Sequence, residues 1–184
     1  RAGDLTPIRV GYGVKTVEGK AKLALRGRDS LRLPPRSHII LRALNQDSSQ
    51  VTIEVVSGSV WTNVAPRARA VDFQVITPDL TAGVRGTLFK TTVIATEGSR
   101  VAVLDSTVAV SSNRRGESVN VNQGMAVIVD LQGVIKPPTP VLPAEYDEWQ
   151  AWDEWRLDFY KNVASFSAVG APVLMGLANQ VAAD

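Results

Sequence analysis

The feature that most constrains the fold of this chain is a succession of short runs rich in Val, Ile, Leu and Thr between Val10 and Asp130. Turn-forming residues interrupt these runs at intervals of roughly eight to twelve residues, a spacing typical of all-β domains. The run from Lys20 to Arg26 alternates polar and apolar residues, as a strand with one buried face does. We therefore predict an all-β fold. The periodicity alone leaves a sandwich, a barrel and a solenoid-like roll open.

The predicted strands are bounded by glycine, proline and short polar residues, which favour turns. A polar stretch at 45–50 separates two of the strands and predicts a hairpin. We expect strands over residues 20–26, 29–33, 37–44, 51–56, 59–64, 71–76, 87–95, 100–105, 107–111, 117–121 and 126–131.

The character of the sequence changes at Lys136, where a proline-rich stretch begins. Proline is unfavourable inside sheets and helices, so this stretch predicts a stiff, extended connection. The chain is accordingly predicted to consist of a β domain (1–135), a Pro-rich linker (136–143) and a C-terminal aromatic and acidic helix with an uncharged tail (144–184).

Residues 144–164 are the one strongly helical stretch, with acidic residues in the first turn, where they complement the helix dipole. Large aromatic residues recur in it at steps of three and four, which places them on one face of an amphipathic helix. Such a face needs a surface to cover it. We predict that the partner-binding residues are Trp149, Trp152, Trp155 and Phe159.

Charge divides the chain into two parts. Residues 1–144 hold 18 Lys or Arg against 11 Asp or Glu, and residues 145–184 hold 2 against 7, which gives +7 and −5 within the +2 of the whole chain. Segments of opposite sign attract one another, so we expect them to dock, within one subunit or between neighbouring subunits.

Several kinds of site are disfavoured by the residues available. There is no cysteine, and His38 is the one histidine, so neither a thiolate or histidine metal site nor a Ser-His-Asp triad can be assembled. The arginines are dispersed over alternating runs, without a recognition helix or an aromatic platform, which disfavours nucleic-acid binding. We predict no catalytic residues, no metal, no cofactor and no enzymatic activity.

The most specific stretch runs from Phe73 to Phe89, where a strand ends in Thr-Pro and a Val-Arg-Gly-Thr-x-Phe sequence opens the next strand. This stretch resembles the signature of the FecR family, and flanking segments at 55–61, 98–110 and 121–126 are similar to family segments. The resemblance covers roughly residues 10–130. The signature residues, which we interpret as structural, are Thr77, Pro78, Val84, Arg85, Gly86, Thr87 and Phe89.

Two signature positions carry a physical expectation, and two places depart from the family pattern. Gly86 is expected to have a positive φ or a close backbone neighbour, and Arg85 to bond turn carbonyls or pair with Asp79. The usual Glu-Gly is Asp105-Ser106 here, and the closing Gly-Gln appears as Gly124-Met125, so the turns at both places are expected to differ.

The FecR resemblance implies a β-solenoid-like or double-layered β roll in the cell envelope, on the periplasmic or extracellular side. In the best-known members, the domain belongs to transmembrane sigma-factor regulators that sense iron-siderophore uptake. This chain begins at Arg1 without a methionine or an apolar signal segment, so we interpret it as a mature or trimmed fragment, with any membrane anchor in a missing upstream segment.

Two hypotheses for the function follow. The first is a non-enzymatic protein-binding or scaffolding subunit that self-associates through its C-terminal segment into an oligomer or filament, or that binds another envelope protein. The alternative is the periplasmic sensory domain of a FecR-type sigma-factor regulator, which receives a partner's segment by edge-strand addition. The charge division favours the first hypothesis, and the family resemblance favours the second.

Overall fold

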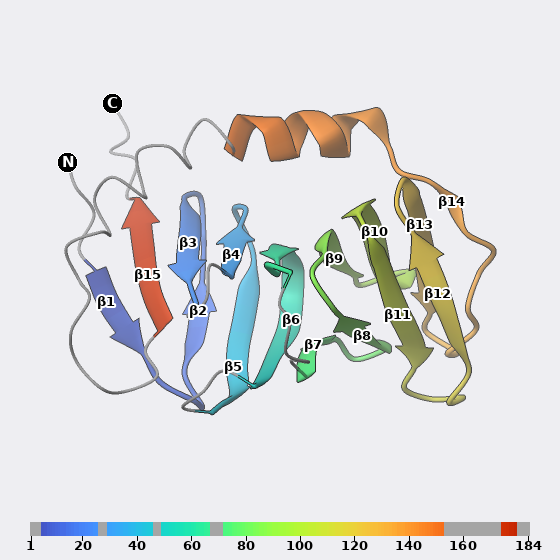
Figure 1. Ribbon diagram of the computed structural model, residues 1–184, viewed down its shortest axis with the longest axis horizontal. Helices are drawn as coiled ribbons and strands as arrows, with labels where there is room; N and C mark the ends of the chain where they lie inside the picture. The colour runs from blue at the N-terminus through green and yellow to red at the C-terminus, as the bar shows by residue number, and fades with distance from the viewer. Residues whose placement is uncertain (1–4, 26–28, 46–48, 67–71, 153–173, 180–184) are drawn as a thin grey trace.

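The computed structural model describes residues 5–25, 29–45, 49–66, 72–152 and 174–179. Strands dominate it, which confirms the all-β prediction (Figure 1). The strands are β1 (Leu5–Ile8), β2 (Gly13–Lys15), β3 (Lys20–Ala24), β4 (Ser30–Leu33), β5 (His38–Leu44), β6 (Gln50–Asn63), β7 (Asp72–Ile76), β8 (Leu80–Val84), β9 (Leu88–Ile94), β10 (Gly98–Asp105), β11 (Thr107–Ser112), β12 (Ser118–Asn122), β13 (Met125–Asp130), β14 (Thr139–Pro140) and β15 (Leu174–Asn179).

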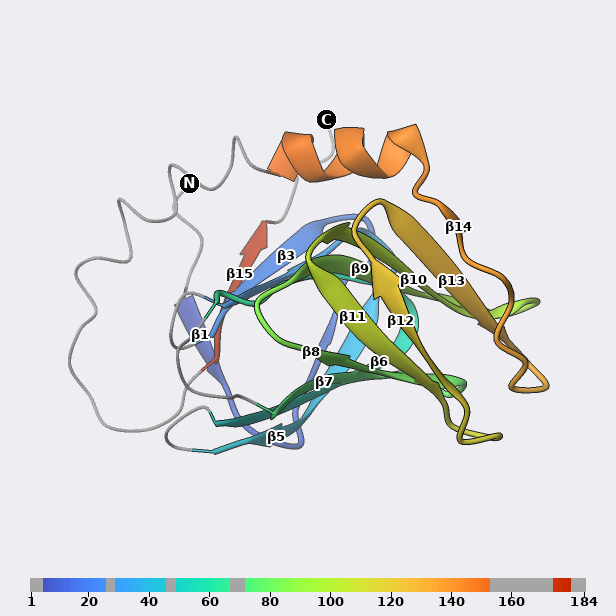
Figure 2. The ribbon, with the colours of Figure 1, turned by 45° about the vertical axis from the view of Figure 1, so that its right-hand side comes forward.

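The strands form two layers that share β6. Sheet A has the order β1-β15-β3-β4-β6-β9-β10-β13-β14, and sheet B has the order β2-β5-β6-β7-β8-β11-β12. All neighbours are antiparallel except β6 and β7, which run parallel. Figure 2 shows the two layers facing each other, as a double-layered β roll requires.

Strand β6 passes from one layer to the other at Gly58. Its first half pairs with β5 and β7 in sheet B, and its second half pairs with β4 and β9 in sheet A. Gly58 has φ +73°, and a Cβ atom there would lie 2.3 Å from the carbonyl oxygen of Arg36. The bend therefore requires glycine, and it joins the two predicted strands 51–56 and 59–64 into one.

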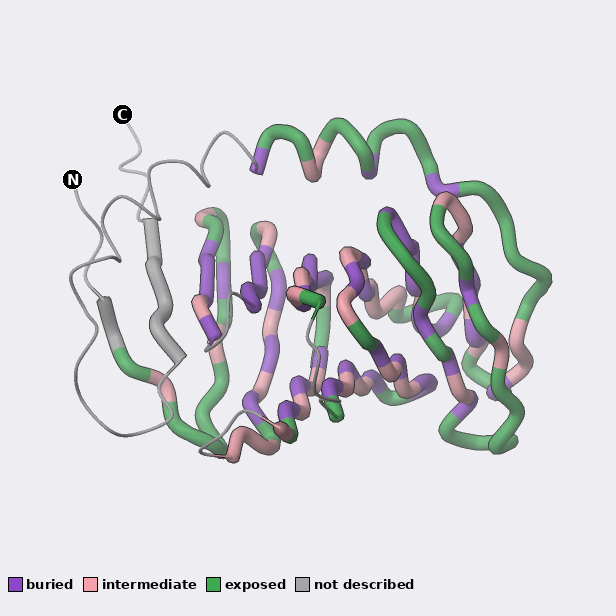
Figure 3. The backbone as a smooth tube through the Cα atoms, viewed as in Figure 1, coloured by how far each residue is buried: buried purple, intermediate pink, exposed green. Residues whose placement is uncertain are grey.

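The main hydrophobic core lies between the layers, as alternating buried positions along the strands show (Figure 3). Sheet A contributes Leu31, Val60 and Phe89 to it, and sheet B contributes Ile53 and Val75. Because strand side chains alternate, the neighbours of these residues in sheet A point to the opposite, outer face. That outer face is covered by a helix.

The helix begins at Pro143, and its described part is residues 143–152. Proline fits the first helical position, where its missing N–H has no helical partner to lose. In Figure 2 the helix, in orange, lies over the outer side of the layer that contains β3, β9, β10 and β13. The described residues include no helix long and apolar enough to cross a membrane.

Five strands were not predicted, among them β8, which the sequence suggested was a connection, and β14, which lies in the predicted linker. Strand β15 lies in the predicted uncharged tail and pairs with β1 and β3. The division at 136 and 144 stays a prediction.

Candidate functional site

The Thr-Pro turn of the signature is a joint between the two layers. The Thr77 hydroxyl accepts the N–H groups of Asp79 at 3.2 Å and Leu80 at 3.0 Å, which closes the turn between β7 and β8. Asp79 is buried and accepts a hydrogen bond from Ser99 Oγ of β10 at 2.7 Å. Asn113 Nδ2 donates to the Thr77 carbonyl at 2.9 Å. The motif thus holds sheets A and B together.

The second half of the signature begins β9. Gly86 has φ +62°, and a Cβ atom there would lie 2.9 Å from Pro66 Cα, so both reasons expected for glycine apply. Thr87 is buried and its carbonyl accepts the N–H of Val64, and Phe89 lies in the main core.

Two further expectations concern Arg85 and the turn at Asp105-Ser106. Arg85 is exposed, and Asp79, one of its two expected partners, is bonded to Ser99. The departure at Asp105-Ser106 is accommodated by a positive φ of 66° at Ser106.

The outer face of sheet A contains a row of side chains that crosses five strands in register. Lys22 lies opposite Arg32, Arg32 opposite Trp61, Trp61 opposite Lys90, and Lys90 opposite Ala102. We call Lys22, Arg32, Trp61 and Lys90 the basic row. The helix lies along this row.

Two helix carboxylates bind basic residues of sheet A. Glu145 accepts a bidentate pair of hydrogen bonds from Arg100, with Nη2 at 2.9 Å from Oε2. Glu148 accepts from Lys90 Nζ at 2.5 Å and from the Trp61 indole N–H at 2.9 Å. Glu145 also accepts the N–H of Leu142 at 3.2 Å, as a capping residue in the first turn does. Each carboxylate therefore meets both a cation and a second donor.

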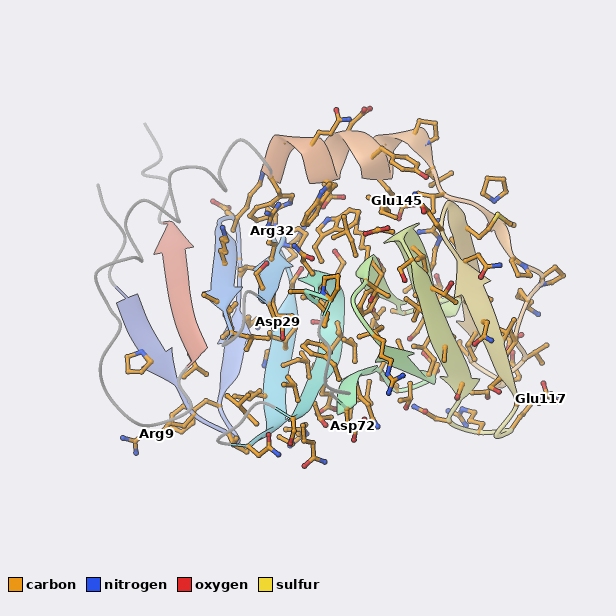
Figure 4. The ribbon with its side chains drawn as sticks, viewed as in Figure 1. Arg9, Asp29, Arg32, Asp72, Glu117 and Glu145 are labelled. Atoms are coloured by element: carbon orange, nitrogen blue, oxygen red, sulfur yellow. The ribbon has the colours of Figure 1, made fainter. Side chains whose placement is uncertain are left out.

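Two helix tryptophans pack on Arg32, which Figure 4 labels beneath the helix. The Arg32 guanidinium lies 3.9 Å from the Trp149 ring centroid and 5.9 Å from that of Trp152. The Trp149 ring packs against Trp61 with 5.4 Å between centroids. Lys20 Nζ lies 5.0 Å from the Trp152 centroid. Cation–π and aromatic contacts of this kind each add roughly 0.5–2 kcal/mol.

The predicted partner-binding residues are thus placed in part. Trp149 and Trp152 pack on the chain's own sheet, whereas Trp155 and Phe159 lie outside the described residues. That these aromatic residues bind another protein stays a prediction. The docking of unlike charges occurs within one chain here, which was one of the two arrangements that the charge division left open.

The basic row was missed by sequence reasoning, which treated the arginines as dispersed over alternating runs. The row exists only once the registers of β3, β4, β6 and β9 are known. A signal did exist in the helix, because the two carboxylates share a helical face with the tryptophans, so a surface that covers the tryptophans also meets the carboxylates. Among the described residues, no group of three or more His, Asp or Glu could hold a metal ion.

Comparison with known proteins gives one family and a shared fold. The FecR protein family matches residues 13–109, from β2 into β11 and just over half of the chain. The match confirms the resemblance that the signature indicated. No curated protein sequence matches the chain significantly.

Two solved structures of a candidate anti-sigma factor from Parabacteroides distasonis, at 1.65 and 2.50 Å resolution, have the same fold. The first has a TM-score of 0.62 at 16% identity and covers 76% of this chain, and the second has a TM-score of 0.60 at 19% identity and covers 79%. The chain spans 64% of the length of each relative.

These findings correct the first functional hypothesis. The prediction of a scaffolding subunit that self-associates through its C-terminal segment is wrong as the main function, because the comparisons favour the sensory alternative. The physical reason lies in the helix, whose Glu145, Glu148, Trp149 and Trp152 are used on the chain's own sheet. The signature, its turn geometry and the match over residues 13–109 agree, and the chain belongs to the FecR protein family.

Proposed function

We propose that this chain is the sensory domain of a FecR-type regulator of a sigma factor, and that it receives its signal through contact with another protein. The observation that carries the proposal is the FecR match over residues 13–109. The fold shared with a candidate anti-sigma factor supports it. The proposed location is the periplasmic or extracellular side of the cell envelope, and the proposed stimulus is iron-siderophore uptake, as in the best-known family members.

The geometry of the site supports binding rather than catalysis. Two cations of the outer face are paired with helix carboxylates, Arg100 with Glu145 and Lys90 with Glu148. Pairs of this kind neutralise the groups that acid–base chemistry would need free. The family is regulatory and not enzymatic, which agrees with a role in protein recognition.

The proposal is tested by deleting the domain from the protein in the organism that encodes it. An in-frame deletion of the codons for residues 13–109 is compared with the parent strain by transcript profiling, with and without iron limitation. We expect the genes of one alternative sigma factor to lose their dependence on the stimulus. The matched control is Gly83→Ala in the intact chain, a small change in β8 with its nearest non-neighbouring atom 4.0 Å away.

Two results would contradict the proposal. If every sigma-dependent gene responds in the deletion strain as in the parent, the chain is not a sigma-factor sensor. If a β-lactamase fused after Asp184 confers no ampicillin resistance while the fusion protein accumulates, the domain is not exported and the proposed location is wrong.

A further inference from the structure

We propose that the basic row is a recognition surface for an acidic, tryptophan-bearing helix of another protein, and that residues 143–152 are its occupant within the chain. This inference rests on the proposed function, because the incoming helix would deliver the signal. It differs from edge-strand addition, since the surface is the outer face of sheet A and not a strand edge.

The charge of the row selects its ligand. Lys22 and Arg32 are direct cross-strand neighbours, and Lys90 lies across Trp61 from Arg32. Like charges directly opposite one another destabilise a sheet unless anions offset them. Lys22 and Arg32 are each only 1% exposed in the presence of the helix. The helix meets Lys90 with a carboxylate and Arg32 with an indole ring, so a cover of the same kind brings negative charge and aromatic surface together.

The spacing on the helix defines what fits. Glu145, Glu148, Trp149 and Trp152 stand at relative positions 0, 3, 4 and 7, which is one face of an α-helix. The carboxylates reach Arg100 and Lys90, and the indoles reach Arg32 and Lys20. A partner helix with the pattern Glu-x-x-Glu-Trp-x-x-Trp would make the same contacts, in the helix-in-groove mode of recognition.

The contact can exchange without opening the fold. Through Trp152, the helix packs on Trp61, Ala102, Leu104 and Ala126 of sheet A. These residues form a small cluster that is separate from the main core. Lys90 and Glu148 keep 14% and 32% of their side-chain surface exposed, so water reaches the pair. Because the two clusters are separate, we expect the main core between the layers to stay intact when the helix leaves.

The covalent link sets how strongly a partner must bind. A tethered segment competes at an effective concentration of about millimolar for short connections. An untethered peptide with a micromolar affinity for the bare row is therefore almost excluded while the helix is docked. Peptide binding to the basic row should therefore be detected in a variant with a weakened helix contact, rather than with a peptide of higher affinity.

The binding test uses a fluorescent peptide with the sequence of residues 141–156 and the full chain in three forms. The first form is the wild type. The second is the double variant Trp149→Ala/Trp152→Ala, which we call the released variant because it lacks the two indoles that hold the helix on the sheet. The third is the released variant with Lys90→Glu added. We expect the released variant to bind by anisotropy at least tenfold more tightly than the wild type, and Lys90→Glu to remove at least tenfold of that affinity. Arg42→Glu, in an exposed pair of sheet B, is the matched control and should change nothing.

A second measurement keeps Trp149 in place, weakens the helix contact only at Trp152, and uses the absence of cysteine from the chain. In Trp152→Cys the thiol replaces a side chain that is 3% exposed beneath the helix. We expect the peptide to raise the rate of thiol labelling at least fivefold, because displacement of the helix exposes the thiol. A peptide of the same composition in scrambled order should leave the rate unchanged.

Three outcomes would overturn the inference. They are no peptide binding by a released variant that melts cooperatively, no effect of the peptide on thiol labelling, and equal binding of the ordered and scrambled peptides. None of them involves transcription, so their occurrence would leave the sensor proposal standing. If instead the deletion strain keeps its sigma response while the peptide binds, the surface is real and the sensor proposal fails.

Discussion

The Trp61 indole donates a hydrogen bond to Glu148 at 2.9 Å across 87 positions of sequence, and so ties the centre of sheet A to the helix that covers it. Lys90 Nζ reaches the other oxygen of the same carboxylate at 2.5 Å. One glutamate therefore neutralises a cation and satisfies an indole N–H that the helix buries. A basic sheet face and an acidic helix in one chain become a stable pair through such shared contacts.

The Lys90–Glu148 pair is predicted to be coupled by about 1–2 kcal/mol in a double-mutant cycle of Lys90→Met and Glu148→Gln. Partial burial reduces solvent screening, and Lys90 is only 14% exposed. The measurement is urea unfolding of the wild type, both single variants and the double variant.

The control cycle is Arg42→Met with Glu54→Gln, whose side chains are 50% and 26% exposed. Exposed pairs contribute about 0–1 kcal/mol, so its coupling should be the smaller. Equal coupling in the two cycles would mean that the helix is not held by this ion pair.

Thr77 is predicted to stabilise the fold through its hydroxyl. Thr77→Val keeps the shape but leaves the N–H groups of Asp79 and Leu80 without that acceptor, which should lower the free energy of unfolding by about 1–3 kcal/mol. Thr77→Ser keeps the hydroxyl and should retain most of the stability. Urea denaturation that ranks serine level with valine would show that the turn does not depend on the hydroxyl.

The strands could largely be predicted from the sequence because alternation is a local property. The runs that became β9, β10 and β11 carry it, and their predicted bounds lie within two residues of the observed ones. Strand β8, Leu-Thr-Ala-Gly-Val, does not stand out, because Gly83 interrupts it and it follows the Thr-Pro turn directly. Its identity as a strand comes from pairing with β7 and β11, which is not local information.

The candidate site could be predicted only on the helix side. The tryptophan spacing indicated a face that needs a cover, and the charge division indicated that a basic surface would supply it. Which basic residues do so depends on registers that bring Lys22, Arg32 and Lys90 into line. Register is set by turns and a bend such as that at Gly58, so no single run contains it.

Asp130 is predicted to stabilise the fold at neutral pH and to lose that effect in acid. Its pKa lies below the usual value, chiefly because Lys136 Nζ donates a hydrogen bond to the carboxylate, with a further bond from the Val134 N–H. A lowered folded-state pKa adds stability above the unfolded-state value, and this is lost as pH falls through the folded-state pKa.

Asp130→Asn should therefore lower the free energy of unfolding at pH 7 and have less effect at pH 2. Urea unfolding at the two pH values measures both, and Glu117→Gln, at an exposed residue before β12, is the control. A loss of the same size at both pH values would assign the effect of Asp130→Asn to packing and not to charge.

Gly86 and Gly83 lie three residues apart in the signature region and are predicted to respond to alanine with opposite signs. At Gly86 the φ of +62° and a Cβ position 2.9 Å from Pro66 Cα both oppose a side chain, so Gly86→Ala should lower the free energy of unfolding by about 1–3 kcal/mol. At Gly83 the nearest atom to a Cβ is the Ala109 carbonyl oxygen at 4.0 Å, and alanine restricts the unfolded chain, so Gly83→Ala should raise it by about 0.4–1 kcal/mol. Chemical denaturation of the two variants beside the wild type gives both values. If Gly83→Ala lowered the free energy of unfolding and Gly86→Ala left it unchanged, the positive φ of Gly86 would not be the reason that the signature has glycine there.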